Sequence, residues 1–163
     1  MKRVKNIAYG AIIAAMYIVL TLFAASFGLA NNAIQVRVSE ALTILPYFTP
    51  YAIGGLFAGC IISNILTGCV VWDVIFGSLA TLIGAVLTYF AGKLPYKNAK
   101  WLSPVGPILS NTIIIPLILA NVYNAKEAMW FLVLTVGAGE VISCGVLGML
   151  LLFALDKHKN RIF

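Results

Sequence analysis

Four ionisable side chains lie inside or beside long apolar stretches of this sequence. Arg37 and Glu40 precede a run without charged residues from 41 to 72, Asp73 follows that run, and Glu140 lies in a glycine-rich apolar segment. Charged groups are costly inside a bilayer, so they usually face the interior of a helix bundle and often mark a substrate path. We expect Glu140 to bind a substrate. The alternative is a carboxylate paired with Arg37, or one protonated in a helix contact.

Two asparagines add hydrogen-bonding groups to the same apolar segments. Asn64 lies near the end of the segment that begins at Tyr51, and Asn111 lies inside a later one. A side-chain amide offers both donors and an acceptor, as a heterocyclic ligand requires. Asp73 falls in the first turn of its expected helix, where capping alone would also explain a carboxylate.

The composition is that of an integral membrane protein. Of the 163 residues, 62% are hydrophobic and only 10% are charged, whereas a soluble domain carries about 25% charged residues. The net charge of +6 resides in termini and loops, where it orients membrane proteins, and does not indicate nucleic-acid binding. The three cysteines have no metal-like spacing, and we expect no cofactor.

We expect one membrane domain over residues 1–163, an all-α bundle of six transmembrane helices with both termini in the cytoplasm. The charge-free run would measure about 48 Å as one helix at about 1.5 Å per residue, too long for a hydrocarbon core of about 30 Å. Pro46 and Pro50 interrupt it, so we predict that the chain turns back at Thr49-Pro50. The expected spans are approximately 7–29, 39–48, 51–68, 73–92, 104–123 and 125–155.

The basic residues support this topology. Six crossings place nine of the eleven Lys and Arg residues on the cytoplasmic side and leave only Arg37 and Lys126 outside, as the positive-inside rule favours. Arg37, Glu40 and Asp73 then gather toward the outer side. The deeper polar residues are Asn111 and Glu140.

The sequence lacks the motifs of an enzyme or an ATPase. It contains no GxxxxGK[ST] phosphate loop, no HExxH and no GxSxG. We therefore expect a substrate-capturing subunit that neither catalyses a reaction nor hydrolyses ATP. A small intramembrane enzyme and a structural or assembly protein are the alternatives from other classes.

Three segments carry a family resemblance that covers nearly the entire chain. They are IQVRVSEALTILPYFTPYAIGGLFAGCIISNI, WDVIFGSLATLIGA and VGAGEVISCGVLG. The chain resembles the membrane substrate-binding (S) components of energy-coupling factor (ECF) transporters, in particular the QueT family of queuosine-precursor transporters. The resemblance implies a multi-pass protein of a prokaryotic-type plasma membrane. Its implied partners are a transmembrane coupling subunit, which docks on Ala11 and Ala15 of the first helix, and two ATPase subunits.

The resemblance also implies a 7-deazaguanine ligand, such as the 7-aminomethyl compound or queuine; an S component for another vitamin is the alternative. Glu140 and Asn111 are then expected to bind the purine edge, with Asp73 or Glu40 near the 7-substituent. Arg37 would hold the loop and its carboxylates in place. The residues expected to complete the site are Asn64 and three aromatic residues that would stack on the ring: Trp72, Trp130 and Tyr123.

Overall fold

The computed structural model describes residues 2–28, 36–96 and 98–159. This part of the chain is entirely helical and contains no strand, as expected for an all-α protein. The predicted end of the first span at residue 29 lies outside the described residues. The elements are α1 (Lys2–Ser26), η1 (Val38–Tyr47), α2 (Tyr51–Leu66), α3 (Val71–Ala91), η2 (Ala99–Leu102), α4 (Val105–Asn121), α5 (Met129–Glu140), η3 (Val141–Gly148) and α6 (Met149–Asp156).

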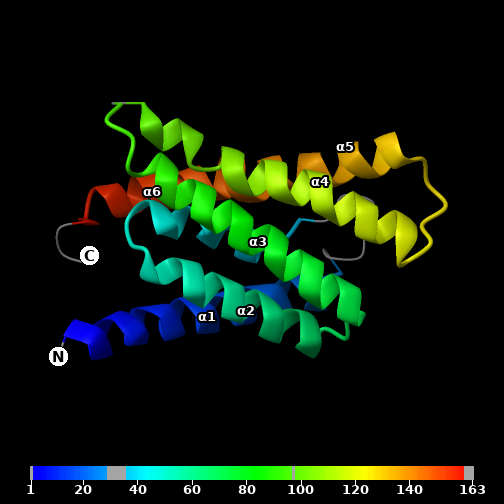
Figure 1. The fold of residues 1–163 in the computed structure, drawn as a ribbon, viewed down its shortest axis with the longest axis horizontal. Coiled ribbons are helices and arrows are strands. Elements are labelled where there is room, and N and C mark those ends of the chain that lie inside the picture. The colour runs from blue at the N-terminus through cyan, green and yellow to red at the C-terminus, as the bar shows by residue number, and fades with distance from the viewer. Residues whose placement is uncertain (1, 29–35, 97, 160–163) are drawn as a thin grey trace.

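The helices form an elongated bundle in which α1 begins and α6 ends at the same end (Figure 1). Four segments of the described chain are long and apolar enough to cross a membrane: Val4–Ser26, Val71–Ala91, Ala99–Asn121 and Met129–Asp156. The helix α2 is apolar but has only 16 residues, about 24 Å at about 1.5 Å per residue. The segment η1 is shorter still.

The turn predicted within the long apolar run is present. The segment η1 is a ten-residue 3₁₀ helix that contains Pro46, and α2 begins directly after Pro50. The residues of η1 from Ser39 to Pro46 are all buried, because η1 packs against α1, α3, η3 and α6. This short helix therefore forms part of the core, and it carries Glu40 into the middle of the bundle.

Glycines bring α1 and α2 into close contact. A Cβ atom on Gly55 would collide with the carbonyl oxygen of Gly10, and one on Gly59 would lie 3.0 Å from the Ala14 carbonyl oxygen. Small residues of this kind let two membrane helices approach closely and gain van der Waals contact. The two contacts lie about one turn apart on each helix, at about 3.6 residues per turn, and fix α1 against α2.

The last helical segment runs from α5 through η3 to α6 without a break. The middle portion η3 is a π helix. Its Gly148 packs closely against Ile44 of η1, because a Cβ atom on Gly148 would lie only 3.0 Å from the Ile44 side chain. Wide π turns in helices often occur at functional sites. Here the wide turn directly follows Glu140.

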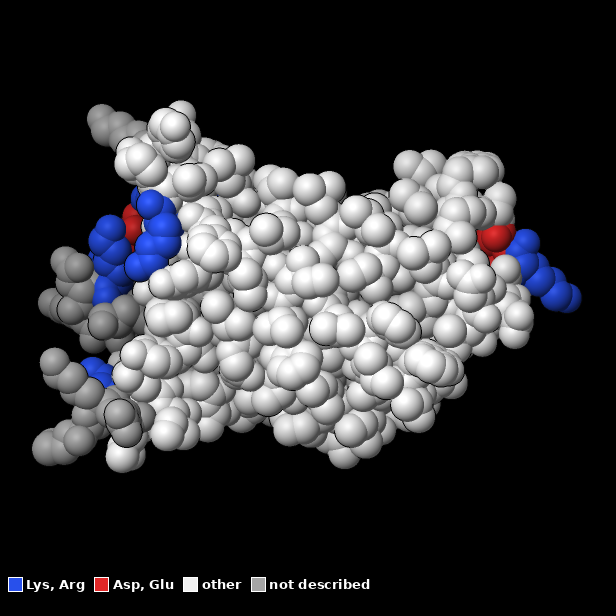
Figure 2. Space-filling model, viewed as in Figure 1, with Lys and Arg blue, Asp and Glu red and all other residues white. Residues whose placement is uncertain are grey.

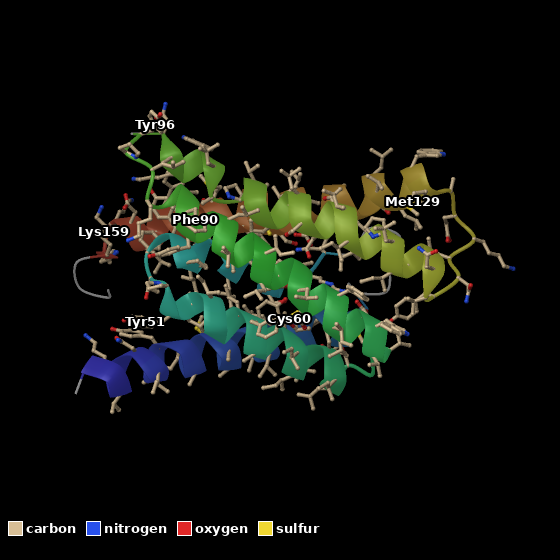
Figure 3. All side chains as sticks on the ribbon, in the orientation of Figure 1. Tyr51, Cys60, Phe90, Tyr96, Met129 and Lys159 are labelled. Carbon is tan, nitrogen blue, oxygen red and sulfur yellow. The ribbon has the colours of Figure 1, made fainter. Side chains whose placement is uncertain are left out.

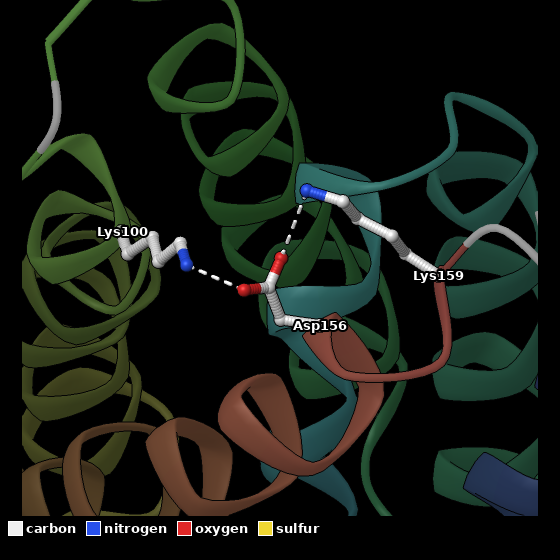
Figure 4. Close-up of polar contacts among 3 residues, drawn as sticks. All are labelled: Lys100, Asp156 and Lys159. Carbon is white, nitrogen blue, oxygen red and sulfur yellow. Dashed lines mark hydrogen bonds and ion pairs between the residues drawn. The ribbon is translucent and has the colours of Figure 1, made fainter.

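Charged side chains lie at the two ends of the face shown in Figure 2, and the middle is uncharged. At the end where the termini lie, Asp156 accepts from Lys100 at 2.5 Å and from Lys159 at 3.3 Å (Figure 4). The contact with Lys100 joins α6 to η2. This distribution suits a bilayer, in which charged groups remain near the headgroups.

Candidate functional site

A cavity of about 340 Å³ opens at the end of the bundle opposite the chain termini. It is enclosed by the last turns of α1 and α2, the segment that leads into η1, the start of α3 and the end of α4. Its polar wall contains Thr21, Arg37, Ser39, Asn64, Thr67, Asp73 and Tyr123, and its apolar wall includes Ala24, Ile115, Ile118 and Leu119. A few polar groups on a mostly apolar lining are typical of a small-molecule site.

Asp73 is held at the cavity wall by Tyr123, which lies in the connection between α4 and α5. The Tyr123 hydroxyl donates a hydrogen bond to Asp73 Oδ2 at 3.1 Å and accepts one from the Val70 amide at 3.4 Å. The other carboxylate oxygen and the Asn64 amide nitrogen lie 3.1 Å and 3.3 Å from the place a Cβ atom would take on Gly77. The side chains of Asp73 and Asn64 therefore both lie beside Gly77. Tyr123 bonds to Oδ2 of Asp73 and not to Oδ1.

Burial, together with the negative charge of Asp73, raises the pKa of Tyr123 from 10.0 to about 12. Tyr123 lies beyond the last residue of α4, in the connection to α5. Its phenol therefore stays protonated at neutral pH and remains a hydrogen-bond donor to Asp73. This keeps the carboxylate in one orientation.

Arg37 contributes the cation of the cavity. Among the charged groups near its guanidinium, Asp73 attracts it most strongly. No ion pair within 4.0 Å joins Arg37 to a carboxylate in the described residues. The cavity therefore presents a guanidinium and a carboxylate that are near one another but not in direct contact, a combination that suits a ligand with both acceptors and donors.

A buried polar cluster around Glu40 adjoins the cavity. Glu40 accepts hydrogen bonds from Tyr17 of α1, from Thr81 of α3 at 3.3 Å and from Asn111 of α4 at 3.4 Å. The preceding residue, Ser39, lines the cavity and accepts from Thr21 at 2.8 Å. One carboxylate thus ties three helices to η1 directly behind the cavity wall.

Glu140 lies in the same cluster, 4% exposed. The Cys144 thiol donates to Glu140 Oε2 at 3.3 Å and lies 3.4 Å from the Glu40 carbonyl oxygen. Ligand atoms of Glu40, Glu140 and Cys144 all lie within 4.8 Å of one another, so of the described residues these three are the group spaced to hold a metal ion. Glu140 is buried, as its place in an apolar segment suggests, and the cysteine near it, Cys144, is buried as well.

The structure divides the predicted site residues into three groups. Arg37, Asn64, Asp73 and Tyr123 line the cavity. The second group, Glu40, Asn111 and Glu140, lies in the buried cluster and does not line the cavity. Trp72 and Trp130 are 56% and 66% exposed, and the structure brings neither of them to the cavity.

Sequence reasoning did not find Tyr17, Thr21, Ser39 or Thr81. Thr21 and Thr81 lie within apolar helices, where hydroxyl residues most often bond to their own helix backbone, whereas Ser39 directly precedes Glu40. Only Tyr17 gives a signal, because a tyrosine in the middle of a membrane helix needs a buried partner for its hydroxyl. That partner is Glu40.

The apolar helices and the charged ends define a multi-pass membrane protein, and the polar cavity is its candidate site for a small molecule. The chain belongs to the QueT transporter family, whose sequence pattern it matches over residues 7–157. The protein described as "Queuosine precursor transporter QueT" from Lactococcus lactis subsp. cremoris (strain MG1363) is 40% identical over 73 residues. That alignment covers 45% of this chain and 43% of the relative, so it spans less than half of either protein. No solved structure matches the chain significantly.

Proposed function

We propose that this protein is the substrate-binding subunit of an ECF-type importer that takes up a queuosine precursor. The family membership establishes a transporter, and the name of the Lactococcus relative supplies the class of substrate. The observation that carries the proposal is the cavity, in which Asp73, Asn64 and Arg37 meet on one polar wall. The chain has no nucleotide-binding motif, so ATP hydrolysis is assigned to partner subunits.

The cavity chemistry suits a 7-deazaguanine. The edge of this base presents a ring N–H and an exocyclic amine side by side, and a carboxylate accepts both in a bidentate pair. Asp73 has one oxygen held by Tyr123 and the other next to Asn64, so it is placed to accept from that edge. Arg37 and the Asn64 amide then donate to the carbonyl oxygen of the base. The volume of about 340 Å³ is near the lower limit of about 300 Å³ for ligand sites, as a single bicyclic base requires.

This assignment differs from the one expected from the sequence. Glu140 and Asn111 were expected to bind the purine edge, but they lie behind the cavity wall, where Asn111 donates to Glu40. In the proposal they hold η1 in position and do not contact the base. Tyr123, which was expected to stack on the ring, instead orients the carboxylate.

We place the protein in the plasma membrane with six crossings and both termini in the cytoplasm. The support is the distribution of charge, because basic residues concentrate at the end where α1 begins and α6 ends (Figure 2). The cavity at the opposite end then faces the outside, where an imported substrate is captured. The short elements η1 and α2 together supply the two additional crossings.

We assign the exposed small-residue face of α1 to the transmembrane coupling subunit, which carries two ATPases. Ala11 and Ala15 are both exposed and lie four residues apart, so they share one face of the helix. The matching close contacts between α1 and α2 use other residues, Gly10 and Ala14. This leaves Ala11 and Ala15 available for a second helix.

Binding to the purified protein tests the proposal. Calorimetric titration with 7-aminomethyl-7-deazaguanine, 7-cyano-7-deazaguanine and queuine is expected to show saturable binding of at least one of them, with riboflavin, thiamine and biotin as controls. Binding of a control vitamin alone would assign the protein to a different substrate. Co-purification with a pair of ATPases tests the ECF assignment separately, and purification without them from cells that express the whole importer would contradict it.

A further inference from the structure

A second hollow lies at the opposite end of the bundle from the cavity. It has a volume of about 440 Å³ and is lined by Lys5, Asn6 and Tyr9 of α1 and by residues 48–51, where η1 turns into α2. Figure 3 shows Tyr51 beside the first turns of α1, at the end of the bundle that also carries Lys159. We call this hollow the Lys5 pocket.

The Lys5 pocket contains hydrogen-bond donors that have no acceptor within the described protein. Thr49 lines it and is only 6% exposed, yet no hydrogen bond joins its hydroxyl to another described residue. Lys5 is exposed, its ammonium nitrogen lies 5.6 Å from the centroid of the Tyr9 ring, and it makes no ion pair with a described carboxylate. A hydroxyl that opens into the pocket beside an unneutralised cation favours an anionic ligand with several acceptor oxygens, which is the chemistry of a phosphate.

The Lys5 pocket opens directly onto an apolar groove of about 700 Å³ on the outer surface of α1 and α2, and the two hollows share Asn6, Pro50 and Tyr51. The groove is lined by small residues, chiefly Gly10, Ala11, Ala14, Gly54 and Ala58. It follows α2 from Tyr51 to Ala58, a length of about 12 Å at about 1.5 Å per residue. A hollow of this shape beside a membrane helix accommodates a hydrocarbon chain.

We propose that the Lys5 pocket and the groove together bind one anionic phospholipid. The phosphate contacts Lys5 Nζ and Thr49 Oγ1, and one acyl chain lies along α1 and α2 in the groove. A free phosphate would gain nothing from the apolar groove, and a hydrocarbon chain alone would leave the Thr49 hydroxyl without a partner.

The position in the membrane favours an anionic lipid. The Lys5 pocket lies at the basic end of the bundle, together with the ion pairs of Asp156. Anionic lipids are concentrated in the cytoplasmic leaflet, where each nearby Lys or Arg contributes about 1 kcal/mol to the attraction. The lipid site requires neither the substrate nor the partner subunits. Ala11 lines the groove and is also assigned to the coupling subunit, so the acyl chain occupies this face while no coupling helix is docked there, and the test uses the protein purified alone.

Native mass spectrometry of the purified protein tests this inference. The protein is mixed with equal amounts of dioleoyl phosphatidylglycerol and dioleoyl phosphatidylcholine, and the fraction that retains each lipid is measured. We expect phosphatidylglycerol to be retained preferentially and Lys5→Gln to weaken its binding by about five-fold. Thr49→Val, which keeps the side-chain shape, is expected to weaken it to a similar degree.

Lys93→Gln is the matched control. Lys93 lies at the same end of the bundle, 5.1 Å from the centroid of the Tyr89 ring, and does not line the Lys5 pocket. It should leave lipid retention unchanged, so an equal loss in this variant would show only general charge attraction and overturn the proposal. Equal retention of the two lipids would also overturn it, as would displacement of phosphatidylglycerol by millimolar glycerol 3-phosphate, which would assign the pocket to a soluble phosphate. A melting curve of each variant in lipid-free detergent confirms that it is folded.

Discussion

Replacing Asp73 by asparagine removes the negative charge from the cavity and changes little else. In the proposed site Asp73 has two roles: Oδ2 accepts from Tyr123 at 3.1 Å, and the other oxygen, which lies near Gly77 together with the Asn64 amide, accepts from the substrate. An asparagine oxygen still accepts the Tyr123 hydrogen bond. Its amide nitrogen then faces the ligand, where it opposes the donors of a guanine-like base.

The expected loss follows from the bonds that disappear. A hydrogen bond to a charged group contributes about 1.5–3 kcal/mol, and about 1.4 kcal/mol corresponds to a factor of ten in the dissociation constant. Asp73→Asn should therefore weaken binding of 7-aminomethyl-7-deazaguanine by about 10-fold to about 150-fold. The melting temperature should change little, because no ion pair of Asp73 is present in the described residues.

Isothermal titration calorimetry measures the effect, with Glu127→Gln as the control. Glu127 is an exposed acid in the connection between α4 and α5 and does not line the cavity, so its replacement keeps the change in net charge but should leave binding intact. If Asp73→Asn binds the ligand within about two-fold of the parent, Asp73 does not accept from the base and the site assignment is wrong. An equal loss of affinity in Glu127→Gln would show that the effect of Asp73→Asn comes only from the change in net charge.

Three further outcomes are expected. Tyr123→Phe should weaken ligand binding by up to about ten-fold, since one orienting hydrogen bond contributes about 1 kcal/mol. Because the pKa of Tyr123 is raised in the folded protein, its protonated phenol contributes stability below pH 10.0, and this contribution is lost as the pH rises toward about 12. The free energy of unfolding of Tyr123→Phe should therefore decline less than that of the parent over this pH range. Identical alkaline profiles would contradict the assignment. Gly55→Ala should destabilise the protein by about 1–3 kcal/mol because its Cβ would collide with Gly10, whereas Gly54→Ala, with no atom within 4 Å of its Cβ, should melt like the parent; equal melting of the two variants would refute the close packing of α1 and α2. Glu40→Gln should lower the melting temperature and remove no direct contact with the ligand. Three neutral donors share this carboxylate, and an unsatisfied buried group costs about 1–3 kcal/mol. A large loss of affinity at unchanged stability would instead place Glu40 in the binding site.

The helical segments of this protein are readable from its sequence, but their local geometry is not. Apolar runs and prolines placed the turn at Thr49-Pro50 correctly, because proline breaks and charge-free stretches have direct physical causes. The 3₁₀ form of η1 and the π turns of η3 were not predicted. These two segments pack against each other, for example at Ile44 and Gly148, and a contact between residues about 100 positions apart cannot be read from local sequence patterns.

The candidate site was only partly predictable for a similar reason. The sequence identifies Asp73 and Glu140 as carboxylates whose charge is costly in an apolar environment. It does not distinguish a carboxylate that binds a ligand from one that bonds to another buried side chain. Burial and hydrogen bonding separate them, since Asp73 lines the cavity and Glu140 does not. Trp72 and Trp130 are exposed near helix ends, as aromatic residues at a membrane interface often are.

The central claim is that the cavity beside Asp73 captures a 7-deazaguanine. The most direct measurement is a calorimetric titration of the purified parent protein with 7-aminomethyl-7-deazaguanine, 7-cyano-7-deazaguanine and queuine, each repeated with the Asp73→Asn variant. We predict saturable binding of at least one compound with one site per chain, and a marked loss in the variant. Absence of binding for all three compounds to a folded parent protein would contradict the claim.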